Sequence, residues 1–341
     1  MNKVFLIRVS AALTFVFLLT GGLFLSRSHV ASSPDFTALS STHSVVLEVP
    51  EGASGSDIAK ILLSAGVVKS FDAYFKLAVS DPRSSQVAPG SHRLDIGISA
   101  KSALAQLLDG KRIPNLVKVA EGAWTSEILA QLNKNGFTKK SLDAAISQIK
   151  LPKEFTGTEG FLFPAQYSFA KGVTALGALQ SMVNRFSTEI ATSGVLAGDS
   201  AFSPMQLLTI ASIIQAEGDT QDFAKISRVI RNRLSTGMQL QMDTTVHYVL
   251  KSRGHVFLSS ASTQVSSPYN TYRHYGLPPG PIGNPGKAAM VAAMNPANGD
   301  WIYFITVKPG DTRFTKSDAQ FLMWKSEYEK NLRAGAFGAK Q

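Results

Sequence analysis

The sequence predicts an α+β protein with an N-terminal transmembrane helix, a repeat-containing α+β region and a larger α+β domain. Three observations predict this class. An uncharged apolar run lies near the start, an internal repeat places a strand before a helix, and strand-like and helix-like segments alternate after residue 150. At 341 residues the chain is too long for one average domain. We expect five segments, namely a cytoplasmic tail (1–8), a transmembrane anchor (9–25), a flexible linker (26–43), the repeat region (44–150) and a larger catalytic domain (151–341).

The composition excludes several classes of function. Hydrophobic residues make up 44% of the chain, enough for sizeable cores, and there is no cysteine. A disulfide scaffold, a thiolate nucleophile and a cysteine-ligated zinc site are therefore excluded. The net charge of +10 suits an anionic partner such as a lipid surface or an acidic cell-wall polymer. Because the basic residues are scattered rather than clustered, nucleic acid is not expected as a partner.

The amino terminus predicts the compartment. Lys3 and Arg8 precede residues 9–25, which carry no charge and reach the short end of the length that crosses a bilayer. Positive charge before the span places the N-terminus in the cytoplasm and exports the rest of the chain. A cleaved signal peptide is the alternative, but its cleavage site at 30–32 would be poor and distant, so an uncleaved anchor is favoured. The serine-rich stretch that follows is typical of a flexible tether.

Two copies of a repeat follow the tether. Residues 47–66 align with residues 117–136 at a constant offset of seventy, and each copy predicts a strand, a Glu-Gly turn, an N-capped helix and a glycine stop. A short strand within 87–94 and a short helix over 102–108 are expected between them. A strand–turn–helix unit of this size resembles the LysM-like modules that bind cell-wall glycans. The alternative is a spacer that holds the next domain away from the membrane.

Hydrophobic periodicity predicts the elements of the third region. We expect helices over 176–191, 207–217, 223–234, 244–250, 287–294 and 320–332, strands over 238–243 and 301–307, and a fixed irregular loop rich in Pro and Gly over 269–286. Ser203 and Pro204 are a suitable N-cap and first residue for the second of these helices.

Glu217 is the leading candidate for chemistry. It continues the apolar stripe of Leu207, Ile210 and Ile214 and falls at the C-terminal end of its helix. Burial and the negative end of the helix dipole both favour the protonated carboxyl, so we expect a raised pKa, as a general acid requires. The alternatives are a structural glutamate paired with an arginine, or a side chain turned to water.

The pieces together resemble the endolytic murein transglycosylases of the MltG/YceG-like family. The matching segments are the anchor, the LysM-like region, 159–164 with Tyr167, 211–217, 231–234, 237–243, 269–272, 276–282, 284–286, 295–296 and 303–304. The resemblance implies that Glu217 is the catalytic acid/base. Relatives often carry a second acid where this chain has Gln215, an Asp where it has Ala165 and a His where it has Arg313, so no role is carried over to these positions.

Five further residues are candidate substrate contacts. Glu159 could orient sugar hydroxyls or stabilise positive charge at C1, with a structural ion pair to Arg231 or Arg233 as its alternative. Asp243 could hold substrate or cap the next helix through the amides of 244 and 245. The other three are Tyr269, Asn270 and Thr271, which could supply a stacking face and hydrogen bonds to a sugar, or could simply belong to a rigid loop. The histidines lack ligand spacing and no nucleotide motif is present, so neither a metal nor a cofactor is expected.

The resemblance implies a lytic transglycosylase that cleaves between N-acetylmuramic acid (MurNAc) and N-acetylglucosamine (GlcNAc) and leaves a 1,6-anhydro end. Because the nucleophile belongs to the substrate, one carboxyl group suffices where hydrolases normally need two. The expected partners are peptidoglycan glycan strands, the plasma (inner) membrane through the N-terminal helix, and glycan polymerases (peptidoglycan synthases) whose strands the enzyme would terminate. A hydrolytic muramidase and a non-catalytic peptidoglycan-binding scaffold are the alternatives.

Overall fold

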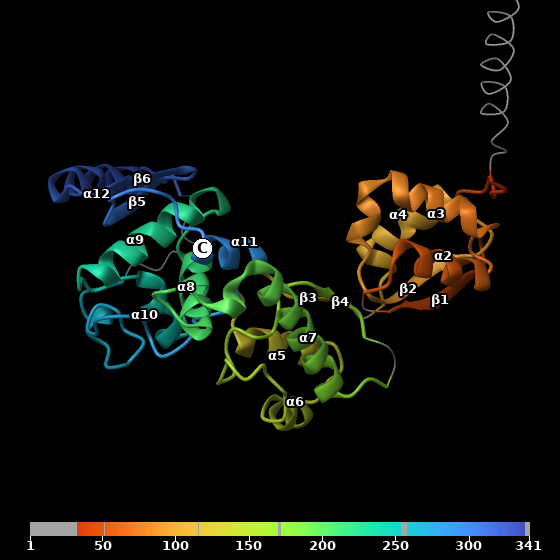
Figure 1. Cartoon of the computed structure of the whole chain (residues 1–341), viewed down its shortest axis with the longest axis horizontal. Coiled ribbons are helices and arrows are strands. Elements are labelled where there is room, and N and C mark those ends of the chain that lie inside the picture. Colours follow the sequence, from red (N-terminus) through yellow and green to blue (C-terminus); the bar gives the residue numbers. More distant parts are fainter. Residues whose placement is uncertain (1–32, 51, 115, 170–171, 254–257, 338–341) are drawn as a thin grey trace, which may run out of the picture. The chain divides into compact units, whose positions relative to one another are not determined.

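The computed structural model describes residues 33–50, 52–114, 116–169, 172–253 and 258–337, and it divides the chain into two compact units, residues 1–114 and 115–341 (Figure 1). The expected anchor, residues 9–25, lies outside the described residues. Within the described ranges, no helix combines the length and apolar character that a membrane crossing requires. The division along the chain falls after residue 114, whereas the sequence predicts a boundary after residue 150, so the second repeat copy belongs to the C-terminal unit.

The N-terminal unit is a two-stranded antiparallel sheet with three helices. Strand β1 (Ser44–Val49) pairs with β2 (Gly90–Asp95) so that Ser44 lies opposite Asp95 and Val49 opposite Gly90. The helices are α2 (Gly55–Ser64), α3 (Phe71–Ser80) and α4 (Ala100–Leu108), with 3-10 turns at Pro82–Gln86 and Gly110–Arg112. The short strand and helix expected between the repeat copies are thus confirmed as β2 and α4. Their inward side chains form one apolar core with α2 and α3.

Part of the expected tether packs on this unit. Ser70 Oγ donates to the carbonyl of Pro34 at 2.7 Å, and the backbone N–H of Ser99 donates to the carbonyl of Ala38 at 2.8 Å. Both oxygens of Asp35 accept from the N–H of Ala100 at 3.1 Å, near the start of α4. Residues 33–38 therefore belong to the folded unit, because their polar groups complete helix ends that the unit leaves open.

Both repeat copies form a strand, a turn and a helix that ends at a glycine. Copy one comprises β1, a turn with Gly52 at φ 76° and α2; copy two comprises β3 (Val117–Lys118), a turn with Gly122 at φ 75° and α5 (Thr125–Lys134). Their N-caps differ. Ser54 forms a reciprocal capping box with Asp57, whereas in copy two the Glu127 carboxylate accepts from the N–H of Trp124 at 2.8 Å.

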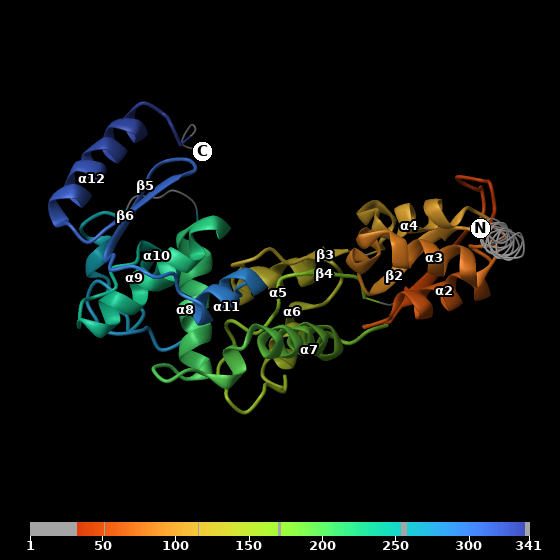
Figure 2. The same ribbon diagram turned by 45° about the horizontal axis from the view of Figure 1, so that its top comes forward.

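Besides copy two, the described residues of the C-terminal unit form seven further α-helices and three strands. They are α6 (Lys139–Ile146), β4 (Gln166–Tyr167), α7 (Ala175–Ser193), α8 (Pro204–Glu217), α9 (Phe223–Ser235), α10 (Asp243–Leu250), α11 (Lys287–Met294), β5 (Tyr303–Lys308), β6 (Asp311–Thr315) and α12 (Asp318–Arg333). β3 pairs with β4 and β5 with β6, both antiparallel. Within this unit α8 lies between a group made of α5, α6 and α7 and a group made of α9, α10 and the β5–β6–α12 layer (Figures 1 and 2).

Helix α8 is the centre of this unit's core. All eight residues from Leu207 to Ile214 are buried, so the helix is covered on every side rather than along one stripe. Such a helix has the small amphipathicity of a fully buried element. The last turn of α8 emerges from the core, and Glu217 lies at its end.

Of the two strands expected in the C-terminal half, one is absent and the other is present. Residues 238–242 form no strand, because Leu240 and Met242 pack inward without a partner strand and Gln241 takes a left-handed conformation with φ 46°. The strand expected over 301–307 exists as β5, but only Val307 in it is buried. It belongs to a hairpin with β6, and α12 covers this hairpin at the edge of the unit (Figure 2).

Candidate active site

Glu217 is the last residue of α8, as predicted. Ser203 caps the start of the helix by accepting from the N–H of Gln206, and Pro204 occupies the first turn. After Glu217 the chain becomes extended at Gly218. A Cβ atom at Gly218 would lie 2.4 Å from Cδ1 of the buried Ile226, so a side chain there would push α8 and α9 apart.

The carboxyl of Glu217 lies at the first turn of α10. Thr244 donates to Oε1 of Glu217 twice, from its hydroxyl at 2.5 Å and from its backbone N–H at 3.3 Å. No donor among the described residues contacts Oε2. One oxygen is thus held in place by the protein, and the other is left to carry a proton and hand it on.

Burial raises the pKa of Glu217 to about 7. The bonds from Thr244 and the charge of Arg233 lower this pKa, and the charge of Asp243 raises it, but loss of hydration is the largest cause. The sequence predicts a raised pKa from burial and from the position of Glu217 at the C-terminal end of α8. The structure adds an opposing effect, because the N–H and hydroxyl of Thr244 in the first turn of α10 stabilise the ionised form.

Arg233 connects the site to the β5–β6 hairpin. Its side chain is 7% exposed, its Nε donates to the carbonyl of Ile302 at 2.6 Å, and its Nη1 donates to the carbonyl of Leu240. Its guanidinium lies 5.7 Å from the ring centre of Tyr303. Arg233 therefore fixes the segment that leads into α10 and places a positive charge near Glu217 without an ion pair to a carboxylate among the described residues.

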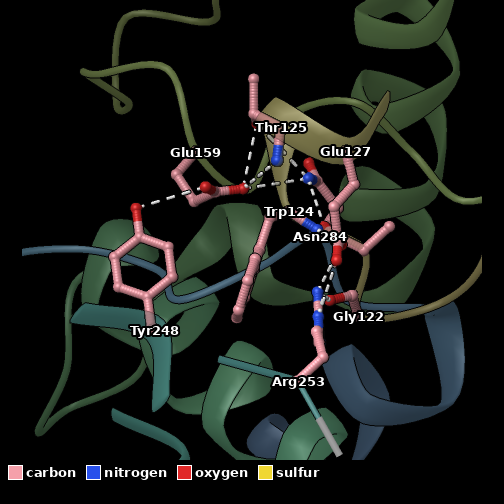
Figure 3. A network of polar contacts seen from close by, with 9 residues as sticks. Gly122, Trp124, Thr125, Glu127, Glu159, Tyr248, Arg253 and Asn284 are labelled. Atoms are coloured by element: carbon pink, nitrogen blue, oxygen red, sulfur yellow. Dashed lines mark hydrogen bonds and ion pairs between the residues drawn. The ribbon is translucent and has the colours of Figure 1, made fainter. Parts of the chain in front are cut away.

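A second carboxyl, Glu159, is held by donors on both oxygens (Figure 3). Its Oε1 accepts from the N–H and hydroxyl of Thr125 at 2.9 and 3.0 Å and from the amide of Asn284 at 3.1 Å. Its Oε2 accepts from the hydroxyl of Tyr248 at 3.2 Å. Burial raises the pKa of Glu159, against the effect of these donors. Since neither oxygen is free, Glu159 is suited to fixing the site rather than to transferring a proton.

Asn284 joins this network to the loop that precedes α11 (Figure 3). Its side chain is fully buried, its Oδ1 accepts from the N–H of Leu162 at 2.7 Å, and its amide also donates to the carbonyl of Ala123 at 2.8 Å. Its carbonyl accepts from the N–H of Gly122 at 2.7 Å. These bonds hold the turn of the second repeat copy at the site. Thr125, which directly follows this turn, donates to Glu159.

The two carboxyl groups lie along one stripe of α10. Thr244 contacts Glu217 and Tyr248 contacts Glu159, and residues four apart lie on the same face of a helix. Their positions differ by one turn, a rise of about 6 Å. Nothing in the sequence marked this face, because neither residue is unusual for a helix.

The structure places the remaining candidates in two groups. Asp243 is exposed and accepts a hydrogen bond from the hydroxyl of Tyr272, and Tyr269 is half-buried with its ring centre 5.2 Å from that of Tyr248. Asp243 is beside Glu217, and Tyr269 is beside the Glu159 network. Their substrate contact stays a prediction.

Asn270 and Thr271 instead use their polar atoms within the protein. Asn270 is fully buried and donates to the carbonyls of Thr263 and Val265 at 3.0 and 2.8 Å. Thr271 is 2% exposed, and its hydroxyl accepts from the N–H of Met242 at 3.0 Å. In this structure they hold the irregular loop against the start of α10, so we assign them no substrate contact.

Two alternatives considered from the sequence are also wrong. Glu159 pairs with neither arginine, because Arg231 binds Asp199 at 2.7 Å and Arg233 binds carbonyls. Asp243 does not cap α10, since the Thr244 amide donates to Glu217. The residues missed as site components were Thr125, Thr244, Tyr248 and Asn284. Asn284 lies within the matching segment 284–286 and Thr244 directly follows Asp243, but no role at the site was given to them, since long-range partners cannot be read from spacing.

The arrangement provides acid/base chemistry with one carboxyl. Glu217 has a pKa near neutrality and one unbound oxygen, so it can donate a proton and take one back near pH 7. The described residues contain no group of three or more His, Asp and Glu side chains arranged to hold a metal ion. The residues that surround Glu217 supply a hydroxyl, an amide and a distant guanidinium, which position it and moderate its charge.

Comparisons with known proteins show the family of this chain. A family model described as the YceG-like family matches residues 47–327. The chain is 31% identical over 334 residues to the endolytic murein transglycosylase of Bacillus subtilis (strain 168), covering 91% of each chain. It is 27% identical over 338 residues to that of Streptococcus pneumoniae serotype 2, covering 87% of this chain and 60% of that relative.

A solved structure agrees with the sequence relatives. The crystal structure of a YceG-like protein from Listeria monocytogenes matches 83% of this chain and 99% of its own, with a TM-score of 0.54 and 27% identity. Since the family model spans both units and includes Glu159 and Glu217, the chain belongs to the YceG-like family.

Proposed function

We propose that the protein is an endolytic peptidoglycan lytic transglycosylase in which Glu217 is the catalytic acid and base. The two relatives named above carry the name endolytic murein transglycosylase and align with most of this chain. The single observation that carries the proposal is the state of Glu217. It is a carboxyl with a pKa of about 7, fixed through Oε1 by Thr244 and without a protein donor on Oε2 among the described residues.

The reaction needs only this one carboxyl. Protonated Glu217 donates its proton to the glycosidic oxygen, the bond from this oxygen to C1 of MurNAc breaks, and GlcNAc leaves with a 4-hydroxyl. The C6 hydroxyl of the same MurNAc attacks C1, and its proton passes to the Glu217 carboxylate. The product carries a 1,6-anhydro ring, no water is consumed, and Glu217 regains the proton that it gave. Holding both groups on one sugar replaces the second catalytic carboxyl of a hydrolase.

Other groups near Glu217 stabilise the intermediate charges. While Glu217 is ionised, the hydroxyl and N–H of Thr244 and the charge of Arg233 stabilise the carboxylate. Positive charge that develops at C1 would be close to this carboxylate and to Asp243. Glu159 is expected to hold the shape of the neighbouring sugar-binding surface through Tyr248 and Asn284.

The test uses the full-length protein in detergent and purified glycan strands. Glu217→Gln keeps the size of the side chain and an acceptor for Thr244, but it cannot donate a proton. We expect no new anhydro ends by mass spectrometry from this variant. Glu329→Gln, which removes an exposed carboxyl from α12, is the matched control and should cleave as wild type. Normal cleavage by Glu217→Gln would reject the assignment.

Product mass separates the proposal from its alternatives. A hydrolytic muramidase would give reducing ends heavier than anhydro ends by one water. A peptidoglycan-binding scaffold would retain glycan strands, and both wild type and Glu217→Gln would leave them uncut.

The cellular role is part of the proposal. Residues 9–25 would anchor the enzyme in the plasma membrane as a single span, with the N-terminus in the cytoplasm and both folded units outside. An enzyme anchored in this way would reach glycan strands as glycan polymerases extrude them, and it could end the elongation of these strands. The repeat copy in the N-terminal unit would bind glycan as LysM-like modules do. Protease protection of the N-terminus in intact spheroplasts tests the orientation.

A further inference from the structure

The stripe of α10 that contacts both carboxyl groups continues to a lysine. Thr244 and Tyr248 are four residues apart and lie on one face of the helix, and Lys251 is the residue that caps its C-terminal end, three positions after Tyr248. Lys251 is two turns, or about 10 Å of helix rise, from Thr244. Its ammonium lies 3.8 Å from the ring centre of Tyr248 and 5.2 Å from that of Trp124.

The backbone at Lys251 is unusual for a residue with a side chain. Lys251 has φ 52° and ψ 37°, and the N–H groups of Lys251 and Ser252 donate to the carbonyls of Tyr248 and His247 in the motif that closes α10. Glycine is the usual residue in this left-handed position, because it alone adopts the conformation without strain. A lysine here is less favourable for folding than glycine, so its presence calls for a reason other than stability.

The two cations at this end of α10 differ in their partners. Arg253 is fixed, because it binds both oxygens of Glu127 at 2.9 and 2.6 Å and the carbonyl of Gly122 at 2.9 Å, with its guanidinium 3.8 Å from the ring centre of Trp124 (Figure 3). Lys251 is exposed, and no carboxylate of the described residues lies within ion-pairing distance of it. The nearby acids do not neutralise it, since Glu127 is paired with Arg253 and Glu159 accepts four hydrogen bonds.

We infer that Lys251, held on the rings of Tyr248 and Trp124, binds a carboxylate of the substrate strand while Glu217 acts on a bond two turns of α10 away. This inference rests on the proposed function, since it takes the strand to be the substrate. Every second sugar of a peptidoglycan strand carries a lactyl group that ends in a carboxylate or in a stem peptide with carboxylates of its own. An ammonium ion on an aromatic surface is held in place yet keeps hydrogens for an anion, which suits a repeating negative charge.

The chain offers variants that separate binding from stability. Lys251→Gly removes the ammonium and places the favoured residue in the left-handed position, so it should unfold at or above the wild-type temperature. Lys251→Arg keeps the charge. Gln241→Gly is the matched control, because Gln241 also has a positive φ, of 46°, and is exposed. It receives the same backbone relief without loss of charge.

The experiment measures kcat and KM of the full-length variants on paired substrates. One strand keeps its carboxylates, and the other has them converted to amides with carbodiimide and ammonia. For wild type we expect about three- to fivefold higher kcat/KM on the charged strand, as one exposed ion pair provides, mainly through KM. Lys251→Gly should lose this preference and cleave the amidated strand as wild type does. Lys251→Arg and Gln241→Gly should keep the preference.

Each outcome decides the inference. The charged-to-amidated ratio is taken within each variant, so a general loss of stability or activity cancels. If Lys251→Gly retains the wild-type preference, or if Lys251→Arg loses it, the inference is wrong. If wild type cuts neither strand, the proposed function fails as well, and the two failures are therefore distinguishable. Charged strands stripped of stem peptides show whether the carboxylate is lactyl, when the preference persists, or belongs to the peptide, when it disappears.

Discussion

The raised pKa of Glu217 predicts that the candidate catalytic residue destabilises the fold at alkaline pH. In the folded protein its pKa is about 7, against 4.5 for an unperturbed glutamate. As pH rises from 4.5 to 7, the unfolded chain loses this proton first, so the free energy of unfolding falls and then stays low above pH 7. Glu217→Gln cannot lose a proton, and it should therefore be more stable than wild type at alkaline pH and similar to it near pH 4.5.

The size of the effect follows from the two pKa values. They differ by about 2.5, and each pKa unit corresponds to about 1.4 kcal/mol, so the upper limit lies between about 3 and 4 kcal/mol. Glu217 is partly exposed, which lowers the expected gain to about 1–2 kcal/mol. For a unit of this length that corresponds to roughly 2–8 °C in the midpoint of thermal unfolding.

Tryptophan fluorescence is a suitable assay. The three tryptophans of the chain are Trp124, Trp301 and Trp324, and all lie in the C-terminal unit with Glu217. Their emission therefore reports the unfolding of this unit alone. Full-length wild type and Glu217→Gln are heated at a series of pH values from 4.5 to 9, with Glu329→Gln as the control.

The unfolding midpoints of the two proteins should depend differently on pH. The midpoint of Glu217→Gln minus that of wild type should be near zero at pH 4.5, rise between pH 5 and 7, and then remain constant. Parallel midpoint curves for the two proteins across the whole range would refute the raised pKa, and with it the account of why this carboxyl keeps its proton.

Three further predictions address the same site. The kcat/KM of wild type should fall as pH rises through about 7, because the acid must be protonated. Asp243→Asn removes a charge that raises the pKa of Glu217, so it should move this fall to lower pH. An unchanged pH profile would contradict the role given to Asp243. Gly218→Ala should lower the free energy of unfolding by about 1–3 kcal/mol and lower kcat, since its Cβ would lie 2.4 Å from Cδ1 of Ile226. Denaturant unfolding and kcat measurements check this, and wild-type values in both would show that α8 and α9 have room to adjust. Tyr248→Phe leaves Oε2 of Glu159 without its donor and should cost about 1–2 kcal/mol, measured by the same unfolding, whereas no change would mean that Glu159 does not depend on this bond.

Local patterns predicted most helices of the chain. Caps and periodicity located α8 with Ser203, Pro204 and Glu217, and the helix expected over 287–294 is α11. The strand predicted over 238–243 was wrong, because alternation alone cannot show whether a partner strand exists. Leu240 and Met242 alternate inward to reach the core from an irregular segment.

Part of the site could be predicted as well. Glu217 stood out because a carboxyl on an apolar stripe is costly, a fact that depends only on neighbouring residues. Thr244, Tyr248 and Asn284 did not stand out, since they reach the two carboxyl groups from segments 27 to 125 residues away in the chain. Asn270 and Thr271 looked like substrate contacts in the sequence, and the structure shows that they support a loop.

The sequence by itself determined the helix that presents Glu217, the two strand–turn–helix copies and the expectation that this carboxyl keeps its proton. These depend on local spacing, capping and the cost of burying charge. Only the tertiary structure decided that copy two belongs to the site, that Glu159 has both oxygens occupied, and that one face of α10 contacts Glu217 and Glu159, with Lys251 on the ring of Tyr248 at the end of this helix. The physical reason is that hydrogen bonds between distant segments form only when packing of the core brings those segments together.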